Sequence, residues 1–319
     1  MVCTKKFVQK GRCSTVTNYN LAVNIAGVEL KNPVITASGT FNSGREYGEI
    51  FDINRLGAIT CKGVSHEPWE GNAPPRTCET YGGMLNAVGL QNPGAAAFIA
   101  DDMPFLRSIE PKVIVNLCGK TTEQYIDVAK DFEGVEGVDL FELNISCPNI
   151  DAGGMAMGTD PKATERITRT IKELVNAPLM VKLSPNVTNI ADIAKAAEAG
   201  GADGISLINT LLGMKIDINK RKPVLGNTKG GLSGPAIKPV AVRMVYEVAQ
   251  AVKLPIIGMG GITSGEDAIE FIMAGATAVA VGMANFHHPL VTLDVLDVIC
   301  EFMERNGIKS IGEIRGCVI

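Results

Sequence analysis

Short, continuous apolar stretches recur along the chain, and segments of helical period separate most of them. Eight such stretches lie at residues 32–39, 58–65, 112–119, 140–148, 178–185, 204–210, 255–261 and 278–284. Strands covered on both faces are apolar throughout, whereas strands with one solvated face alternate between apolar and polar residues. The pattern therefore predicts eight buried, parallel strands joined by helices.

The helical segments carry start and stop signals. One apolar face, between the fifth and sixth stretches, follows the i, i+3, i+4, i+7 spacing: Ile190, Ile193, Ala194 and Ala197. Thr188 is placed to cap the start of this helix, and the glycine pair at 200–201 to end it. In a later helix, Ser264 and Asp267 have the spacing of a capping box.

Alternating strands and helices predict an α/β fold, a (β/α)8 TIM barrel whose active site lies at the carboxyl ends of the strands. Two connections, residues 64–93 and 211–234, are too long for simple barrel loops, so we expect hairpin excursions over this C-terminal face. The chain shows no repeat of 20–50 residues and no low-complexity tract. We therefore expect an N-terminal extension of unassigned role (1–18) and one barrel domain (19–319).

The composition narrows the function classes. With a net charge of −4, the chain lacks the excess of Lys and Arg with which nucleic-acid-binding proteins neutralise phosphates. Residues 1–20 are polar, and no run approaches the roughly 20 apolar residues of a membrane span. We expect a cytoplasmic protein that binds neither nucleic acid nor a membrane.

The eight cysteines have no metal-ligand spacing, because no C-x-x-C pair occurs and the three histidines do not complete a ligand pattern. We therefore expect no metal ion or iron–sulfur cluster on this chain. Cys61, Cys118 and Cys300 are interpreted as small core residues.

Polar residues gather at the predicted carboxyl ends of the strands. They are Ser38, Lys62, Asn116, Asn144, Cys147, Asn149, Lys182, Asn209 and Thr210. One interpretation is that strand ends are simply where the chain meets water. Lysines and amides converging on one barrel mouth instead favour a ligand that is anionic and rich in amide-like edges.

Glycines follow the last two predicted strands, at Gly260, Gly261 and Gly282. They allow backbone N–H groups to approach a phosphate, at the loops that often hold phosphate in such barrels. The alternative is that they only permit tight strand-to-helix turns. A phosphate site beside lysines and amides favours flavin mononucleotide (FMN), with Lys182 placing positive charge where a reduced flavin becomes anionic.

Cys147 lies between Asn144 and Asn149, before a glycine-rich connection at residues 151–158 that suggests a lid. Because a thiol has an ordinary pKa of about 8.5, it can act as a general base near neutral pH. A core cysteine is the alternative. A Schiff-base lysine, as in barrel aldolases, is a further alternative, but that chemistry does not need Cys147.

The motifs "ASGTF", "MLNAVGLQNPG", "NISCPN", "KLSPNV", "GGLSGPAIKP" and "GMGGI" resemble those of the cytosolic, FMN-dependent dihydroorotate dehydrogenases, and the resemblance extends from about Tyr19 to near the C-terminus. It implies oxidation of (S)-dihydroorotate to orotate in de novo pyrimidine synthesis. It also implies that Cys147 removes the C5 proton while FMN accepts the hydride from C6.

The resemblance also implies two sets of contacts. The substrate set is Lys62, Asn86, Asn144, Asn149, Asn209 and Thr210. The FMN set is Ala37, Ser38, Lys62, Asn116, Asn144, Lys182, Ile208, Gly234, Gly260, Gly261, Gly282 and Met283.

Within the family, the long segment at 208–239 resembles the NAD-linked, heteromeric class. That class implies a homodimer core of a heterotetramer, in which FAD and a [2Fe–2S] cluster belong only to an electron-transfer subunit. The basic segment at 220–222 could contact such a partner, although a solvated loop explains these charges equally simply.

Several alternatives remain open from the sequence. The fumarate-linked dihydroorotate dehydrogenases share the barrel, whereas the quinone class has Ser where Cys147 stands. Dihydropyrimidine dehydrogenase has a similar motif with His in place of Asn149. A tRNA dihydrouridine synthase would be expected to show a basic surface and an RNA-binding extension, and neither is evident in this sequence. A flavin-binding component with an inert site is the non-enzymatic alternative.

Overall fold

The computed structural model describes residues 19–146 and 157–319 of the 319-residue chain. Cys147, Asn149 and the expected N-terminal extension therefore lie outside the described residues. Among the helices described, none is both long and apolar enough to cross a membrane.

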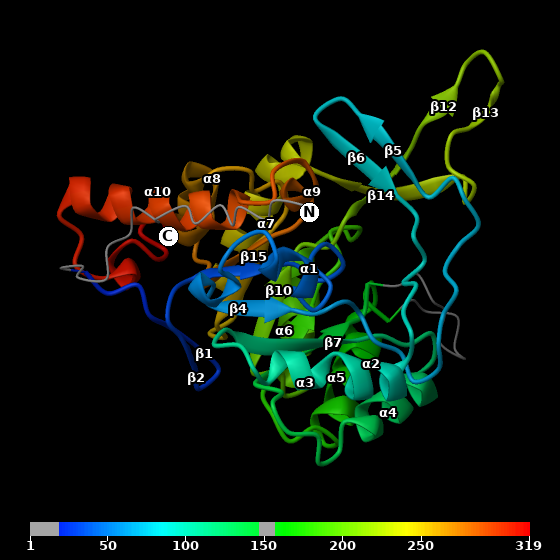
Figure 1. Cartoon of the computed structure of the whole chain (residues 1–319), viewed down its shortest axis with the longest axis horizontal. Coiled ribbons are helices and arrows are strands. Elements are labelled where there is room, and N and C mark those ends of the chain that lie inside the picture. The colour runs from blue at the N-terminus through cyan, green and yellow to red at the C-terminus, as the bar shows by residue number, and fades with distance from the viewer. Residues whose placement is uncertain (1–18, 147–156) are drawn as a thin grey trace, which may run out of the picture.

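The centre of the molecule is a closed barrel of eight parallel strands, in the order β10-β15-β16-β3-β4-β7-β8-β9. Barrel strands such as β4, β7 and β10 lie at the centre of Figure 1, with helices outside them. The strands are β3 (Val34–Thr36), β4 (Ala58–Thr60), β7 (Lys112–Leu117), β8 (Leu140–Asn144), β9 (Leu179–Lys182), β10 (Gly204–Leu207), β15 (Ile256–Met259) and β16 (Ala278–Val281). Each lies within one of the eight apolar stretches, so the predicted (β/α)8 barrel is confirmed. The strands are buried along nearly their whole length, which explains their continuous apolar character.

Helices surround the barrel. The longer ones are α4 (Thr122–Asp131), α5 (Pro161–Lys172), α6 (Ile190–Ala199), α7 (Lys238–Ala251), α8 (Gly265–Met273) and α10 (Val291–Asn306). The shorter ones are α1 (Arg45–Gly48), α2 (Ala95–Asp101), α3 (Met103–Leu106) and α9 (Ala284–His287), with 3-10 turns η1 (Ile53–Arg55), η2 (Pro235–Ile237) and η3 (Ile311–Glu313).

The two predicted helix starts have different outcomes. The capping box of Ser264 and Asp267 is present at α8, as predicted. The expected cap at Thr188 is wrong, because α6 begins at Ile190 and its N-cap is Asn189, whose side chain accepts a hydrogen bond from the Ala191 N–H at 3.1 Å. Asn occupies the position directly before the helix, where its amide oxygen can reach the free N–H groups of the first turn.

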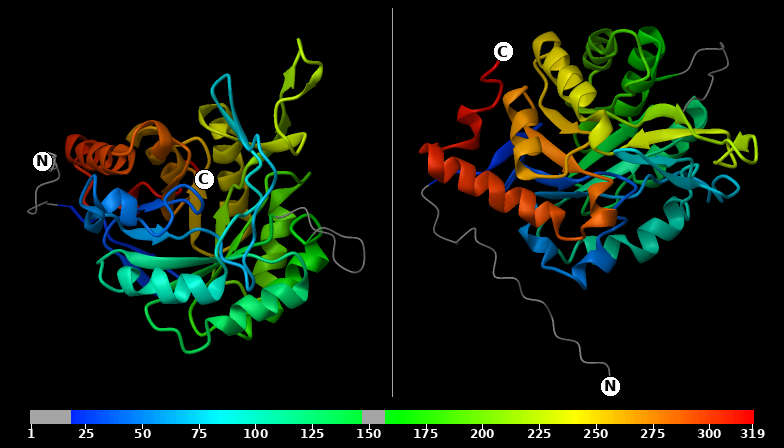
Figure 2. Two further views of the ribbon diagram at one scale, coloured as in Figure 1. Left: turned by 45° about the vertical axis from the view of Figure 1, so that its right-hand side comes forward. Right: turned by 90° about the horizontal axis from the view of Figure 1, so that it is seen from above.

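The two long connections form hairpins over the C-terminal face, as predicted, and they also pair with each other. β5 (Thr77–Thr80) and β6 (Gly83–Asn86) join β11 (Leu211–Met214) and β14 (Lys229–Ser233) in one antiparallel sheet, ordered β11-β14-β6-β5. A second hairpin, β12 (Ile216–Asp217) with β13 (Lys222–Pro223), projects beyond this sheet (Figure 2). The pairing of β14 with β6 joins segments about 150 residues apart and holds both excursions over the barrel mouth.

The opposite end of the barrel is closed by a small hairpin, β1 (Val23–Ile25) with β2 (Val28–Leu30). Ile25 and Leu30 are fully buried and pack into one apolar cluster with the first residues of several barrel strands, among them Ala58, Leu140 and Ala278. The lower part of the barrel is therefore filled with apolar side chains, and the polar inward residues lie nearer the C-terminal end.

Candidate active site

A cavity opens at the C-terminal face of the barrel, beneath the four-stranded sheet. Its empty volume is about 1310 Å³, part of which is open to solvent. The cavity brings together the sequence-predicted site residues that lie in the described ranges: Ala37, Ser38, Lys62, Asn86, Asn116, Asn144, Lys182, Ile208, Asn209, Thr210, Gly234, Gly260, Gly261, Gly282 and Met283. Cys147 and Asn149 fall outside those ranges.

Strand alternation explains how the polar side chains reach the cavity. Successive strand residues face opposite sides, so residues two apart share a face. In β7, Asn116 shares the inward face of Ile114, and in β8, Glu142 and Asn144 share the face of Leu140. Both β7 and β8 thus place an apolar residue in the lower barrel and a polar residue at the cavity floor.

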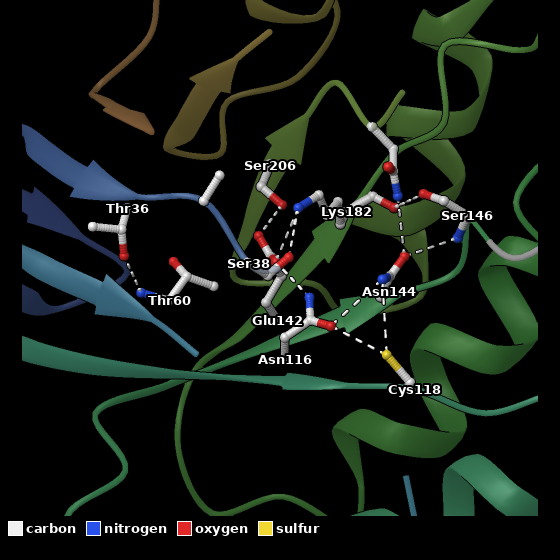
Figure 3. Close-up of polar contacts among 12 residues, drawn as sticks. Thr36, Ser38, Thr60, Asn116, Cys118, Glu142, Asn144, Ser146, Lys182 and Ser206 are labelled. Carbon is white, nitrogen blue, oxygen red and sulfur yellow. Dashed lines mark hydrogen bonds and ion pairs between the residues drawn. The ribbon is translucent and has the colours of Figure 1, made fainter. Parts of the chain in front are cut away.

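The centre of the floor is a buried ion pair (Figure 3). The Lys182 ammonium lies 3.4 Å from Glu142 Oε1 and donates to Ser38 Oγ at 3.0 Å. The same Glu142 oxygen accepts from Asn116 Nδ2 at 2.6 Å, and Oε2 accepts from Ser206 Oγ at 2.7 Å. Because both charged side chains are almost fully buried, each needs these partners to offset the loss of water.

A row of amides extends from this ion pair along the floor. Asn116 Oδ1 accepts from the Cys118 thiol at 3.2 Å and from Asn144 Nδ2 at 3.5 Å. Asn144 Oδ1 in turn accepts from Asn209 Nδ2 at 3.4 Å. The Tyr125 hydroxyl donates to the Asn144 backbone oxygen at 2.6 Å, which fixes the end of β8. The row presents alternating donors and acceptors, as a ring with N–H and C=O edges requires.

Lys62 supplies a second positive charge at the cavity. Burial lowers the pKa of the Lys62 ammonium below its ordinary value; the nearby Cys118 thiol opposes this effect, and the charge of Lys182 adds to it. Within the described part of the chain, Lys62 Nζ has no hydrogen-bond or ion-pair partner. An anionic ligand group in the cavity would provide one.

The four-stranded sheet and the residue before β11 bring two further predicted residues, Asn86 and Thr210, to the cavity. Asn86, the last residue of β6, donates from Nδ2 to the Gly231 backbone oxygen at 3.3 Å. Gly231 in β14 approaches Thr210 so closely that a Cβ there would lie 2.0 Å from Thr210 Oγ1. Only glycine allows this approach, which sets Asn86 and Thr210 over the barrel mouth.

The other side of the cavity is lined by glycines that follow β14, β15 and β16. Gly234, Gly260 and Gly261 have positive φ angles of 113°, 124° and 83°. Residues with a Cβ atom rarely adopt these backbone angles. A Cβ on Gly282 would meet only the Ala37 Cβ, at 3.5 Å, and would otherwise enter the cavity. Within the described ranges, the N–H groups of Gly261 and Met283 have no hydrogen-bond acceptor. The backbone here is free to bind an anion.

A cluster of charges holds the glycine loop in place. Asp267 Oδ2 accepts from the N–H and the hydroxyl of Thr263, both at 2.8 Å, and Lys238 Nζ contacts Asp267 Oδ1 at 2.7 Å and Glu270 at 2.8 Å. Burial alone would raise the pKa of Asp267, but the hydrogen bonds from Lys238 and Thr263 outweigh it and lower that pKa. The hydrogen bonds to Asp267 and Glu270 raise the pKa of Lys238.

Together, these features fit FMN. The glycine-lined side suits a phosphate, and the floor offers a buried cation and a row of amides for a flat ring with carbonyl and nitrogen edges. Gly282 leaves space in the cavity that a phosphate could occupy. A Cβ on this residue would take up part of that space.

Glu142 and Ser206 were not predicted as part of the site. The sequence held one usable signal, because "LFELN" places a carboxylate within an otherwise apolar, buried strand. Charged residues are almost never fully buried without a partner, so such a residue predicts a buried cation nearby. Cys118 was interpreted as a core residue; it is buried, and it also contacts the amide row.

Comparison with known proteins agrees with this geometry. A sequence model of the family described as "Dihydroorotate dehydrogenase" matches residues 20–303. The chain belongs to the dihydroorotate dehydrogenase family. Among similar dihydroorotate dehydrogenases, a protein of Alkaliphilus metalliredigens is 64% identical over 301 residues, covering 94% of this chain and 99% of that protein. It is named "Dihydroorotate dehydrogenase B (NAD(+)), catalytic subunit".

Other dihydroorotate dehydrogenases with the same name are also similar over nearly their full length. The protein of Lachnoclostridium phytofermentans is 61% identical over 299 residues, covering 94% of this chain and 99% of that protein. The protein of Geobacillus sp. is 52% identical over 296 residues, which cover 93% of this chain and 95% of that protein.

Proposed function

We propose that this chain is the catalytic subunit of an NAD-linked dihydroorotate dehydrogenase, which oxidises (S)-dihydroorotate to orotate in de novo pyrimidine synthesis. The observation that carries this proposal is that a glycine-lined side and a floor of lysines and amides meet in the same cavity. The names and high identity of the relatives support the same activity.

Enzymes of this family bind FMN, and bound FMN supplies the hydride acceptor for the reaction. In this chain, Gly234, Gly260, Gly261, Gly282 and Met283 are proposed to hold the phosphate through backbone N–H groups. Lys182, Asn116 and Asn144 are proposed to bond the ring edge, and Ser38 to hold Lys182 in place. The remaining contacts are proposed to come from Ala37, Lys62 and Ile208.

The substrate is proposed to bind in the same cavity, against the amide row. Lys62 would pair with its carboxylate, since this ammonium has no other partner within the described ranges. The ring amides would bond to Asn86, Asn144, Asn149, Asn209 and Thr210. Cys147 is proposed to take the proton from C5 while a hydride leaves C6, so that a C5=C6 double bond forms and both electrons leave the substrate as hydride.

The electrons are proposed to leave through a second subunit that carries FAD and a [2Fe–2S] cluster and reduces NAD. The word "subunit" in the names of the relatives supports a separate partner. A homodimer of this chain is proposed as the core of a heterotetramer in the cytoplasm.

Anaerobic mixing of the purified chain with dihydroorotate tests the activity. We expect bound FMN with an absorbance that bleaches on mixing, reoxidation by oxygen or dyes, and negligible NAD reduction until the partner is added. A flavin that dithionite bleaches but dihydroorotate does not would contradict the enzyme assignment. Rapid NAD reduction by the chain alone would contradict the partner, and efficient turnover with fumarate would indicate the fumarate-linked class.

A further inference from the structure

Glu142 is a buried carboxylate to which the proposed reaction gives no role. It lies in β8, beneath the cavity, and its residue surface is 1% exposed. A carboxylate in such a place costs several kcal/mol unless cations and hydrogen-bond donors surround it. Three other barrel strands, β7, β9 and β10, supply those donors through Asn116, Lys182 and Ser206.

Two of the three donors are themselves floor residues of the cavity. Because Asn116 donates from its amide nitrogen to Glu142, its oxygen is the atom that faces Cys118 and Asn144. Glu142 therefore sets which way the Asn116 amide points. Lys182 uses one N–H toward Ser38 and one toward Glu142, which leaves a third for a ligand.

Glu142 also determines how much positive charge the floor presents. Lys182 and Lys62 both line the cavity. Burial is the main cause of the lowered pKa of Lys62, and the charge of Lys182 adds to it. Within the described ranges, no Asp or Glu is among the residues that line the cavity. The Glu142 carboxylate, 3.4 Å from Lys182 in a poorly screened interior, offsets part of that charge from below.

We propose that Glu142 is a positioning residue that holds Lys182 and Asn116 against the flavin and, by offsetting the charge of Lys182, keeps the reduction potential of the flavin low. This inference rests on the proposed function, because FMN must occupy the cavity. A flavin gains electrons and negative charge on reduction, so an uncompensated cation raises its potential and a nearby carboxylate lowers it. A low potential keeps the reduced flavin a good electron donor to the next carrier.

The test is a reductive titration of the FMN-loaded protein against reference dyes, without dihydroorotate. Glu142→Gln removes the charge and keeps the shape, and we expect reduced FMN to bind at least tenfold more tightly relative to oxidised FMN. For a two-electron couple this is a rise in potential of about 30 mV. Ser206→Ala is the matched control, because it removes one hydrogen bond to Glu142 but leaves the charge of Glu142. The flavin potential of this variant should differ from the wild-type value by less than a third of the shift expected for Glu142→Gln.

An unchanged or lower potential in FMN-loaded Glu142→Gln would overturn the proposal. If that variant does not fold, Lys182→Met and the double variant Glu142→Gln/Lys182→Met decide the matter. Lys182→Met alone should have a lower flavin potential than the wild type. In the double variant the potential should return toward the wild-type value. Equal potentials in these two variants would overturn the proposal. A wild-type protein that binds no FMN would instead contradict the proposed function.

Discussion

The two sides of the cavity are built on opposite principles. The glycine end, made of Gly234, Gly260, Gly261 and Gly282, acts through bare backbone and depends on the absence of side chains. The polar end, made of Lys62, Asn116, Asn144 and Lys182, acts through side chains that hold one another in place. In the proposed enzyme, the glycine end binds the cofactor phosphate, and the polar end contacts the reacting rings.

This difference predicts two separable kinds of defect. A change at the glycine end should weaken FMN binding without altering the chemistry of any flavin that remains. A change at the polar end should leave FMN bound and alter its reduction or its response to pH. Four variants, ordered from the largest expected effect to the smallest, test this separation.

The largest effect is expected from Cys147→Ala, three residues after Asn144 in the sequence. Loss of a positioned general base typically slows a reaction about 10²–10⁴-fold, so flavin reduction by dihydroorotate should slow by that factor with FMN still bound. Stopped-flow absorbance measures it, with Cys300→Ala, a buried cysteine in α10, as the control. The wild-type rate should also rise with pH as the thiolate forms. Unchanged reduction kinetics in Cys147→Ala would remove the base assignment.

Gly282→Val tests the glycine end. A Cβ there enters the cavity and meets only Ala37. Overpacking typically costs about 1–3 kcal/mol, so FMN affinity should fall about 5–150-fold while the far-UV dichroism stays normal. Gly282→Ala should have a smaller effect, and Gly261→Val is a poor test because its Cβ would lie 2.8 Å from the Gly234 backbone oxygen. Unchanged FMN affinity in Gly282→Val would show that the phosphate lies elsewhere.

Lys62 should give ligand binding an unusual pH dependence. Burial and the charge of Lys182 lower the pKa of Lys62, although Cys118 opposes the shift, so the ammonium loses its proton below the ordinary lysine value of about 10.4. Orotate affinity should then fall by up to about tenfold for each pH unit above that lowered pKa. Fluorescence titrations from pH 7 to 10 measure this fall. Lys62→Met should bind weakly throughout and lack this component, and an identical pH profile in both proteins would exclude Lys62 as the carboxylate partner.

The smallest effect is expected from Asp267→Asn, which weakens the support of the glycine loop. The lost capping interactions are typically worth about 0.5–2 kcal/mol, and FMN affinity should fall only a few-fold. Because the folded-state pKa of Asp267 is lowered, its contribution to stability is fully present above about pH 4, the unfolded-state value, and is lost as the pH falls through the folded-state pKa.

Thermal unfolding between pH 2 and 7 checks this, since the Asn variant should lack that part of the acid destabilisation. Glu270→Gln is the matched control: Glu270 also pairs with Lys238, but it is exposed and takes no part in the capping box, so the change should be near zero. Equal acid sensitivity of wild type and Asp267→Asn would contradict the role of Asp267.

The sequence predicted those features of the fold and the site that depend on short stretches of neighbouring residues. The eight barrel strands follow from apolar runs, and Lys62 and Lys182 stood out because a charge directly follows or ends such a run. The pairing of β14 with β6 could not be predicted, because it joins distant segments whose own residues specify no partner. Glu142 was missed because the strand was interpreted as uniformly apolar, and the α6 cap was misplaced by one residue because Thr188 and Asn189 are both suitable caps.

The small hairpin β1–β2 has a consequence for the order of events at the opposite end of the barrel. It closes the barrel bottom with Ile25 and Leu30, while the cavity opens toward the four-stranded sheet. In the proposed enzyme, cofactor and substrate would both enter by the mouth, the deeper one first. A flavin at the floor would arrive before its substrate and stay beneath it, so that each product departs without disturbing the cofactor. In the proposed enzyme, closure at one end would thereby separate cofactor loading, a rare event, from the exchange of small molecules in every catalytic cycle.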